Sequence, residues 1–96
     1  MLVTKLITSK SGIEEMALYP NPVTGILNIQ IKTETEGKGQ IVILDITGKQ
    51  MLSKNQIFEK GINYSSLDVS LLNTGVYLVQ YIDALQNRLS LRVVKN

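Results

Sequence analysis

The sequence predicts an all-β domain: an immunoglobulin-like β-sandwich of about seven antiparallel strands connected as a Greek key. Apolar and polar residues alternate with a period of two over several short segments. Turn residues separate these segments at intervals of about ten residues, which is typical of small β-sandwiches. No segment has the length and the apolar spacing of an amphipathic helix.

Length and composition fit one globular domain. The chain has 96 residues, of which 44% are hydrophobic and 19% are charged. We expect residues 1–15 to be a flexible lead-in and residues 16–96 to form the sandwich. The lead-in contains a small, polar joint made of Ser9, Lys10, Ser11 and Gly12. Residues 2–7 are too short an apolar stretch for a signal peptide, so we expect any export signal to lie outside this sequence.

The first two strands are expected on either side of a bend. Residues 16–19 are extended, and the proline-rich segment after them fixes φ and removes two N–H donors, which ends a ladder. This segment consists of Pro20, Asn21 and Pro22. Residues 27–31 then alternate apolar and polar side chains, which predicts a strand with one face in water.

The middle of the chain predicts a central hairpin. The run Ile41–Leu44 is apolar at every position, which indicates a strand covered on both faces. Gly48, followed by Lys49, predicts a turn in which glycine takes a positive φ. The chain then returns antiparallel through residues 50–58.

Three more strands complete the predicted fold. Gly61 opens a strand over residues 62–69, and a tight turn precedes Gly75, where we also expect a positive φ. Residues 76–83 alternate so that Tyr77 packs in the core, with its hydroxyl at the rim. In the last strand, we expect the cations to form an exposed basic stripe consisting of Arg88, Arg92 and Lys95. Such a stripe either protects a sheet edge by its charge or docks a partner.

Composition argues against several functions. A net charge of +2 is too small for the basic surface that nucleic-acid binding needs. The chain has no histidine and no cysteine, which removes the usual general base, disulfides and most transition-metal sites. We therefore expect no enzymatic activity, no cofactor, no metal and no small-molecule substrate.

Two other kinds of chemical site have weaker support in the sequence. Serines beside a lysine could form a nucleophile, but serine in β-domain turns usually bonds the backbone. These serines are Ser65, Ser66 and Ser70. Acidic residues could meet at one end of the sandwich and bind calcium, although no calcium-loop spacing links them. They are Glu34, Glu36, Asp45, Asp68 and Asp83.

Five segments, taken in order, resemble the C-terminal sorting domain of type IX secretion cargo. They are Leu18–Pro22, Gly25–Ile29, Ile43–Lys49, Leu71–Val79 and Val93–Lys95. The resemblance covers residues 16–96. It implies a protein exported in the manner of Bacteroidetes, in which an N-terminal cargo reaches the periplasm and the tail is then read by the outer-membrane translocon and its shuttle and sortase proteins. The cargo ends at the cell surface or outside the cell.

The resemblance also implies roles for individual residues. The family motif falls on Pro20, Asn21, Pro22, Gly48, Lys49, Gly75 and Tyr77. The candidate recognition residues are Arg88, Arg92, Val93, Val94, Lys95 and Asn96, and strand addition to this last strand is the hypothesis for translocon contact. The sortase would cut within residues 9–12. The alternative function is a β-sandwich module that binds a glycan or another protein.

Overall fold

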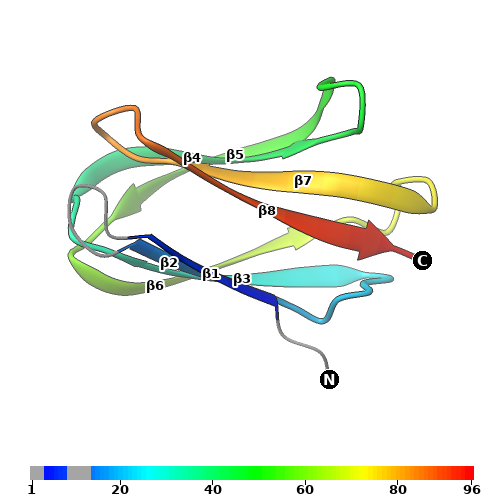
Figure 1. Cartoon of the computed structure of the whole chain (residues 1–96), viewed down its shortest axis with the longest axis horizontal. Helices are drawn as coiled ribbons and strands as arrows, with labels where there is room; N and C mark the ends of the chain where they lie inside the picture. The colour runs from blue at the N-terminus through cyan, green and yellow to red at the C-terminus, as the bar shows by residue number, and fades with distance from the viewer. Residues whose placement is uncertain (1–3, 9–13) are drawn as a thin grey trace.

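The predicted all-β sandwich is confirmed. The computed structural model describes residues 4–8 and 14–96, and these residues form two four-stranded antiparallel sheets without a helix (Figure 1). The strands are β1 (Thr4–Thr8), β2 (Glu14–Tyr19), β3 (Ile26–Thr33), β4 (Gly37–Leu44), β5 (Gln50–Phe58), β6 (Gly61–Asp68), β7 (Gly75–Ile82) and β8 (Arg88–Lys95). One sheet has the order β1-β2-β3-β6 and the other the order β5-β4-β7-β8.

Strands β2 to β8 correspond to the seven predicted strands. The eighth, β1, falls within the range expected to be a lead-in and pairs with β2 from Thr4 opposite Leu18 to Thr8 opposite Glu14. Strand β2 begins at Glu14, two residues before the predicted boundary at Met16. The predicted joint at residues 9–12 lies outside the described residues, so the linker there stays a prediction.

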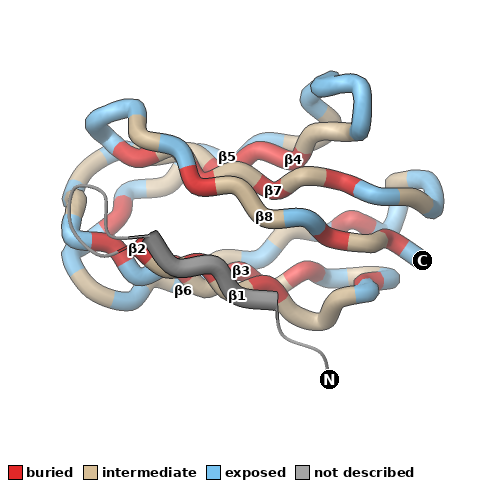
Figure 2. The backbone as a smooth tube through the Cα atoms, in the orientation of Figure 1, coloured by how far each residue is buried: buried red, intermediate tan, exposed pale blue. Residues whose placement is uncertain are grey.

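The core lies between the two sheets because alternate side chains of each strand point inward. Figure 2 shows buried residues recurring along the strands of both sheets. Phe58 and Tyr81 form an aromatic pair in this core, with ring centroids 4.8 Å apart. Gly39 is needed beside it, since a Cβ there would lie 2.8 Å from the Phe58 ring. The predicted burial of both faces of Ile41–Leu44 holds for Ile41 to Ile43, and Leu44 is half-buried.

Tyr77 locks the connection from β6 to β7. Its hydroxyl donates a hydrogen bond of 2.7 Å to the carbonyl of Asn73, four residues earlier. The ring is buried, as predicted, and its hydroxyl lies at the rim. A tyrosine bonded back to the preceding corner is typical of immunoglobulin-like sandwiches. This tyrosine corner and the strand order favour the predicted immunoglobulin-like connectivity.

Two hairpins of the second sheet share one turn design. Asp45 opens the β4–β5 turn and accepts from the backbone N–H groups of Thr47 and Lys49 at 2.9 and 3.0 Å. Asp83 opens the β7–β8 turn and accepts from Leu85 and Asn87, both at 2.9 Å. The fourth residue of each turn has a positive φ. The two turns therefore share the same backbone hydrogen bonds and the same backbone conformation at this position, although their sequences differ.

The residues with this positive φ are Gly48, at 89°, and Gln86, at 68°. Gly48 thus confirms its prediction, because glycine adopts the left-handed region without a steric penalty. The prediction for Gly75 is wrong, since its φ is not positive. Gly75 is instead the first residue of β7, paired with Lys95.

We predict that Tyr77→Phe destabilises the domain by about 1–2 kcal/mol, because it removes the hydrogen bond to Asn73 and keeps the buried ring. Urea unfolding followed by circular dichroism measures this. Tyr64→Phe is the matched control, since Tyr64 is 66% exposed, and it should change the free energy of unfolding by less than about 0.5 kcal/mol. Equal losses in both variants would contradict the role of the tyrosine corner.

Candidate functional site

The predicted recognition residues of β8 are divided between its outer and inner faces. Arg88 and Arg92 are exposed on the outer face, whereas Val93 is buried in the core. The prediction that Lys95 completes the basic stripe is wrong: it is only 7% exposed. Lys95 lies two residues after Val93 and therefore shares its inward face. Its Nζ donates a hydrogen bond of 2.7 Å to the Asn96 main-chain oxygen.

The proline-rich segment after β2 covers part of the β8 edge. Val94 N–H donates to Asn21 Oδ1 at 2.9 Å, and Asn21 Nδ2 donates to the Arg92 carbonyl at 3.4 Å. Val23 continues the contact with a parallel bridge to Lys95. Its N–H donates to the Val94 carbonyl and its carbonyl accepts from Asn96 N–H, both at 2.9 Å. We call this set of bonds the β8 clamp.

The clamp limits where strand addition could occur on β8, and strand addition itself stays a prediction. The outward backbone groups from Arg92 to Asn96 already have partners within the domain. An incoming strand would have to displace these partners before it could pair there. The clamp thus occupies the edge of β8 at residues 92–96, and the outer face of the strand remains open to a partner.

An apolar groove lies on this outer face, beside Arg92. Its volume is about 370 Å³. The lining residues are Leu44, Asp45, Ile46, Gly48, Val76, Tyr77, Leu78 and Arg92. Ile46 is 83% exposed, an unusual position for a large apolar side chain in a turn. The groove thus joins the Asp45–Lys49 turn, the start of β7 and one cation of β8.

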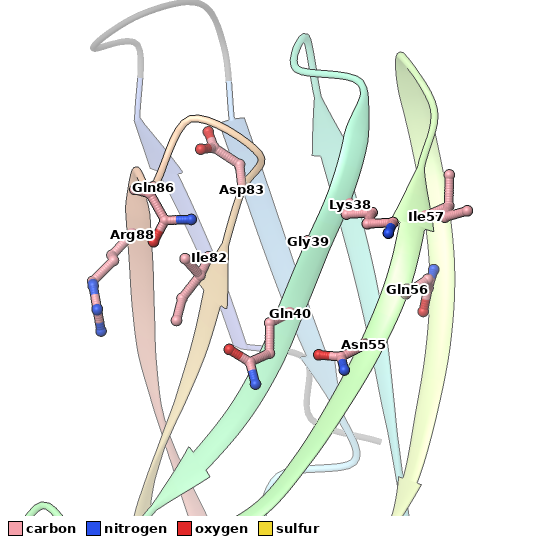
Figure 3. A pocket seen from close by; sticks show the side chains of 10 residues that line it. All are labelled: Lys38, Gly39, Gln40, Asn55, Gln56, Ile57, Ile82, Asp83, Gln86 and Arg88. Atoms are coloured by element: carbon pink, nitrogen blue, oxygen red, sulfur yellow. The ribbon is translucent and has the colours of Figure 1, made fainter.

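A second hollow, more polar, lies at the other end of the same sheet (Figure 3). Its volume is about 560 Å³. Figure 3 shows Arg88 and Lys38 on opposite sides of Gln40, which projects from β4. The remaining lining residues are Gly39, Asn55, Gln56, Ile57, Ile82, Asp83 and Gln86. Two cations and several amides therefore occupy one end of the outer face, and the apolar groove occupies the other.

The acidic residues considered for calcium serve the turns. The Thr47 hydroxyl donates to Asp45 at 2.6 Å, and this bond, followed by that from Lys49 N–H, lowers the pKa of Asp45. Ser70 likewise bonds Asp68 and lowers its pKa. Within residues 14–96 there is no group of three or more acidic side chains placed to hold a metal ion. These carboxylates act as acceptors for turn backbone.

Comparison with known families decides the identity of the fold. Residues 17–96 match the family described as "Secretion system C-terminal sorting domain". The chain belongs to this family. A sorting domain of this kind is a type IX secretion signal: it implies interaction with the type IX machinery and export across the outer membrane, and the family is in general not catalytic. No curated protein matches the chain.

Most motif positions of this sorting domain build its structure. Asn21 forms the β8 clamp, Gly48 and Lys49 complete a hairpin turn, and Tyr77 forms the tyrosine corner. Sequence reasoning missed the groove, whose apolar residues belong to two different strands and a turn. Ile46 was the one indication of the groove in the sequence, because it is a large apolar residue within the otherwise polar segment Asp45–Lys49. The described residues include no helix able to span a membrane.

We predict that Asn21→Ala lowers the free energy of unfolding by about 1–3 kcal/mol, since Val94 N–H and the Arg92 carbonyl both lose a partner. Hydrogen exchange should show faster exchange of the Val94 amide than of amides in β4. Asn55→Ala, at an exposed position of β5, is the control and should leave both quantities unchanged. Unchanged exchange at Val94 in Asn21→Ala would refute the clamp.

Proposed function

We propose that this domain is read in its folded form by the outer-membrane translocon of the type IX system, and that it thereby directs an N-terminal cargo out of the cell. The family match over residues 17–96 supports this proposal. So does the position of the last strand, whose outer face is exposed while its edge is held by the clamp. In transit the cargo would occupy the periplasm, and it would end at the cell surface or in the medium.

The proposed contact surface is the outer face of β8 with the apolar groove beside Arg92. Residues 88, 90, 92 and 94 point outward and contribute two arginines, a serine and a valine, without an acidic side chain. Interface centres are enriched in arginine and in apolar side chains that fill pockets. An acidic translocon surface with one apolar side chain to insert would fit this face, because charge complementarity favours encounter and fixes register.

The clamp favours recognition through side chains rather than through strand addition. Binding to the outer face leaves the bonds from Asn21 and Val23 to β8 intact. Val93 and Lys95 then contribute by holding β8 in the sandwich, since both lie inward. Arg88, Arg92, Val94 and Asn96 remain the predicted residues that a partner can reach.

Sortase cleavage in residues 9–12 is part of the same proposal. The segment lies between β1 and the domain matched by the family, and its residues are small or polar, which suits a protease substrate. After cleavage the cargo would be released or anchored at the surface. The alternative, a module that binds glycan or protein for the cargo, has weaker support, because the chain has no tryptophan to stack on a sugar ring.

The export role predicts the behaviour of a reporter fusion. A secretion signal and a fluorescent protein are placed before this chain in a type IX-competent bacterium and in its translocon-deficient mutant. We expect fluorescence at the surface or in the medium of the competent strain alone. In that strain, Arg88→Glu with Arg92→Glu should reduce export roughly tenfold, because reversed charge repels an acidic partner.

Lys32→Glu with Lys60→Glu is the matched control, since it makes the same change of charge on exposed residues away from the groove. Circular dichroism of the purified variants establishes that each is folded. Equal export by both double variants would exclude the outer face of β8 as the contact. Periplasmic retention of the unmodified fusion in both strains would instead overturn the export role and favour the binding module.

Cleavage predicts a defined product. Mass spectrometry of the exported reporter should find its new C-terminus within residues 9–12 or just before them. A fusion in which this segment is replaced by prolines should be exported with the tail attached, because proline restricts the extended backbone that proteases bind. Release of a cut reporter from the proline variant would place the cleavage site elsewhere.

A further inference from the structure

Two carboxyl groups are buried together between the sheets. Glu14, the first residue of β2, is 5% exposed, and Asp83, at the end of β7, is 1% exposed. The pairing of Glu15 with Lys32 brings Glu14 toward Thr33, and Thr33 Oγ1 lies 3.4 Å from the hydroxyl of Tyr81, two residues before Asp83. A side-chain hydrogen bond with Asp83 is among the causes that raise the pKa of Glu14. Neither belongs to the family motif or to the apolar groove. A buried pair of acids is costly unless one of them keeps its proton.

The surrounding bonds place that proton on Glu14. Asp83 Oδ1 accepts from Leu85 N–H and Asn87 N–H at 2.9 Å, and Asp83 Oδ2 accepts from Asn87 Nδ2 at 3.3 Å. Three donor groups therefore already point at the oxygens of Asp83. Glu14 then bonds Asp83 as the donor, through its carboxylic O–H.

Charged and titratable groups of the neighbouring elements also lie near the pair. Lys38 of β4 and Arg88 of β8 line the polar hollow together with Asp83. From β7, the Tyr81 hydroxyl is buried and lies 3.4 Å from Thr33 Oγ1 of β3. Burial is the main cause that raises the pKa of Tyr81, and the charges of Glu14 and Asp83 raise it further. The β1 residue opposite Glu14 is Thr8, which has no titratable group. Among the described residues, no lysine or arginine contributes to the shift at Glu14.

We propose that Glu14 and Asp83 form a pH-sensitive latch, which holds the start of β2 against the β7–β8 turn and releases it as the pH rises. Glu14 belongs to one sheet and Asp83 to the other, so their hydrogen bond ties the two sheets together at the end of the sandwich where the chain enters β2. Loss of the shared proton leaves two negative charges in one buried site. Moving Glu14, the first residue of β2, into water relieves this repulsion.

The direction of the pH effect follows from proton linkage. Burial, followed by the hydrogen bond and the charge of Asp83, raises the pKa of Glu14 from 4.5 to about 7. Below pH 4.5 the latch is protonated in the closed and open forms alike. Between pH 4.5 and about 7 the open form loses its proton first, so the closed form becomes progressively less favoured. Above this range the effect is complete, and opening is favoured by roughly 300-fold relative to acid.

The first test uses the unmodified chain, so that no folding defect can interfere. Carbon-13 NMR of the glutamate side-chain carboxyls, recorded from pH 3 to pH 9, gives the titration of Glu14 directly. We expect its midpoint at least about one unit above those of the exposed glutamates. A midpoint among those of the exposed glutamates would overturn the latch.

The second test locates the opening. Hydrogen exchange at pH 5.5 and pH 8, corrected for the intrinsic exchange rate, should show protection of β2 falling at the higher pH while protection of β4 is kept. Glu14→Gln preserves a donor to Asp83 without a titratable proton, and its β2 protection should not depend on pH. Glu15→Gln, next to it on the opposite face of β2, should behave like the unmodified chain.

Two results would contradict the proposal. If β2 in Glu14→Gln loses protection with pH as the unmodified chain does, the latch does not depend on Glu14. If protection falls equally in β2 and β4, the pair affects global stability and does not open locally. Neither result bears on export, so the latch and the proposed sorting function can fail separately.

Discussion

The β8 clamp is the constraint on which the rest of the structure depends. Its bonds join Asn21 and Val23 to residues more than 70 positions later in the chain. The segment between β2 and β3 makes these bonds. It leaves the sheet of β2, contacts β8 at the edge of the other sheet, and returns to begin β3. The clamp therefore cannot form without β8. A domain that ends before β8 lacks both the strand and the partner of its proline-rich segment.

This dependence bears on how a sorting signal works. If the clamp needs β8, the folded surface near the C-terminal strand exists only in a complete domain, and a truncated cargo would not present it. The prolines support the same arrangement, because a segment without N–H donors at Pro20 and Pro22 cannot continue the β2 ladder and is free to cross to the other sheet. In the proposed function, the motif would therefore act on recognition by completing the fold.

The sequence predicted what depends on local alternation and missed what depends on pairing. Alternation located β3, β7 and most of β8, and a glycine-containing turn located the β4–β5 hairpin. At the end of β8 the alternation itself places Lys95, two residues after Val93, on the inward face, but a lysine was expected to lie in water because of its charge. Lys95 was placed on the wrong face for this reason. Pairing with Gly75 and Val23, far away in sequence, fixes its orientation.

The candidate site was predicted even less completely, again for a physical reason. A groove formed by Leu44, Ile46, Val76 and Leu78 requires the register of β4 against β7, which pairs Leu44 with Leu78 and cannot be read from either strand separately. Arg92 was identified because a charged residue that alternates with apolar neighbours must face water. Its significance lies in the apolar neighbours that tertiary structure brings beside it.

The two matching turns show that the buried acid pair is not a by-product of building a hairpin. Asp45 and Asp83 accept the same backbone bonds, yet Asp45 is partly exposed and its pKa is lowered by its donors. A turn of this design therefore forms without a second carboxyl group. An apolar residue or a glutamine at position 14 would fill the site beside Asp83 without the cost of burying an acid. What Glu14 adds is a proton whose loss near neutral pH weakens one contact between the sheets, and that contact holds the first residue of β2.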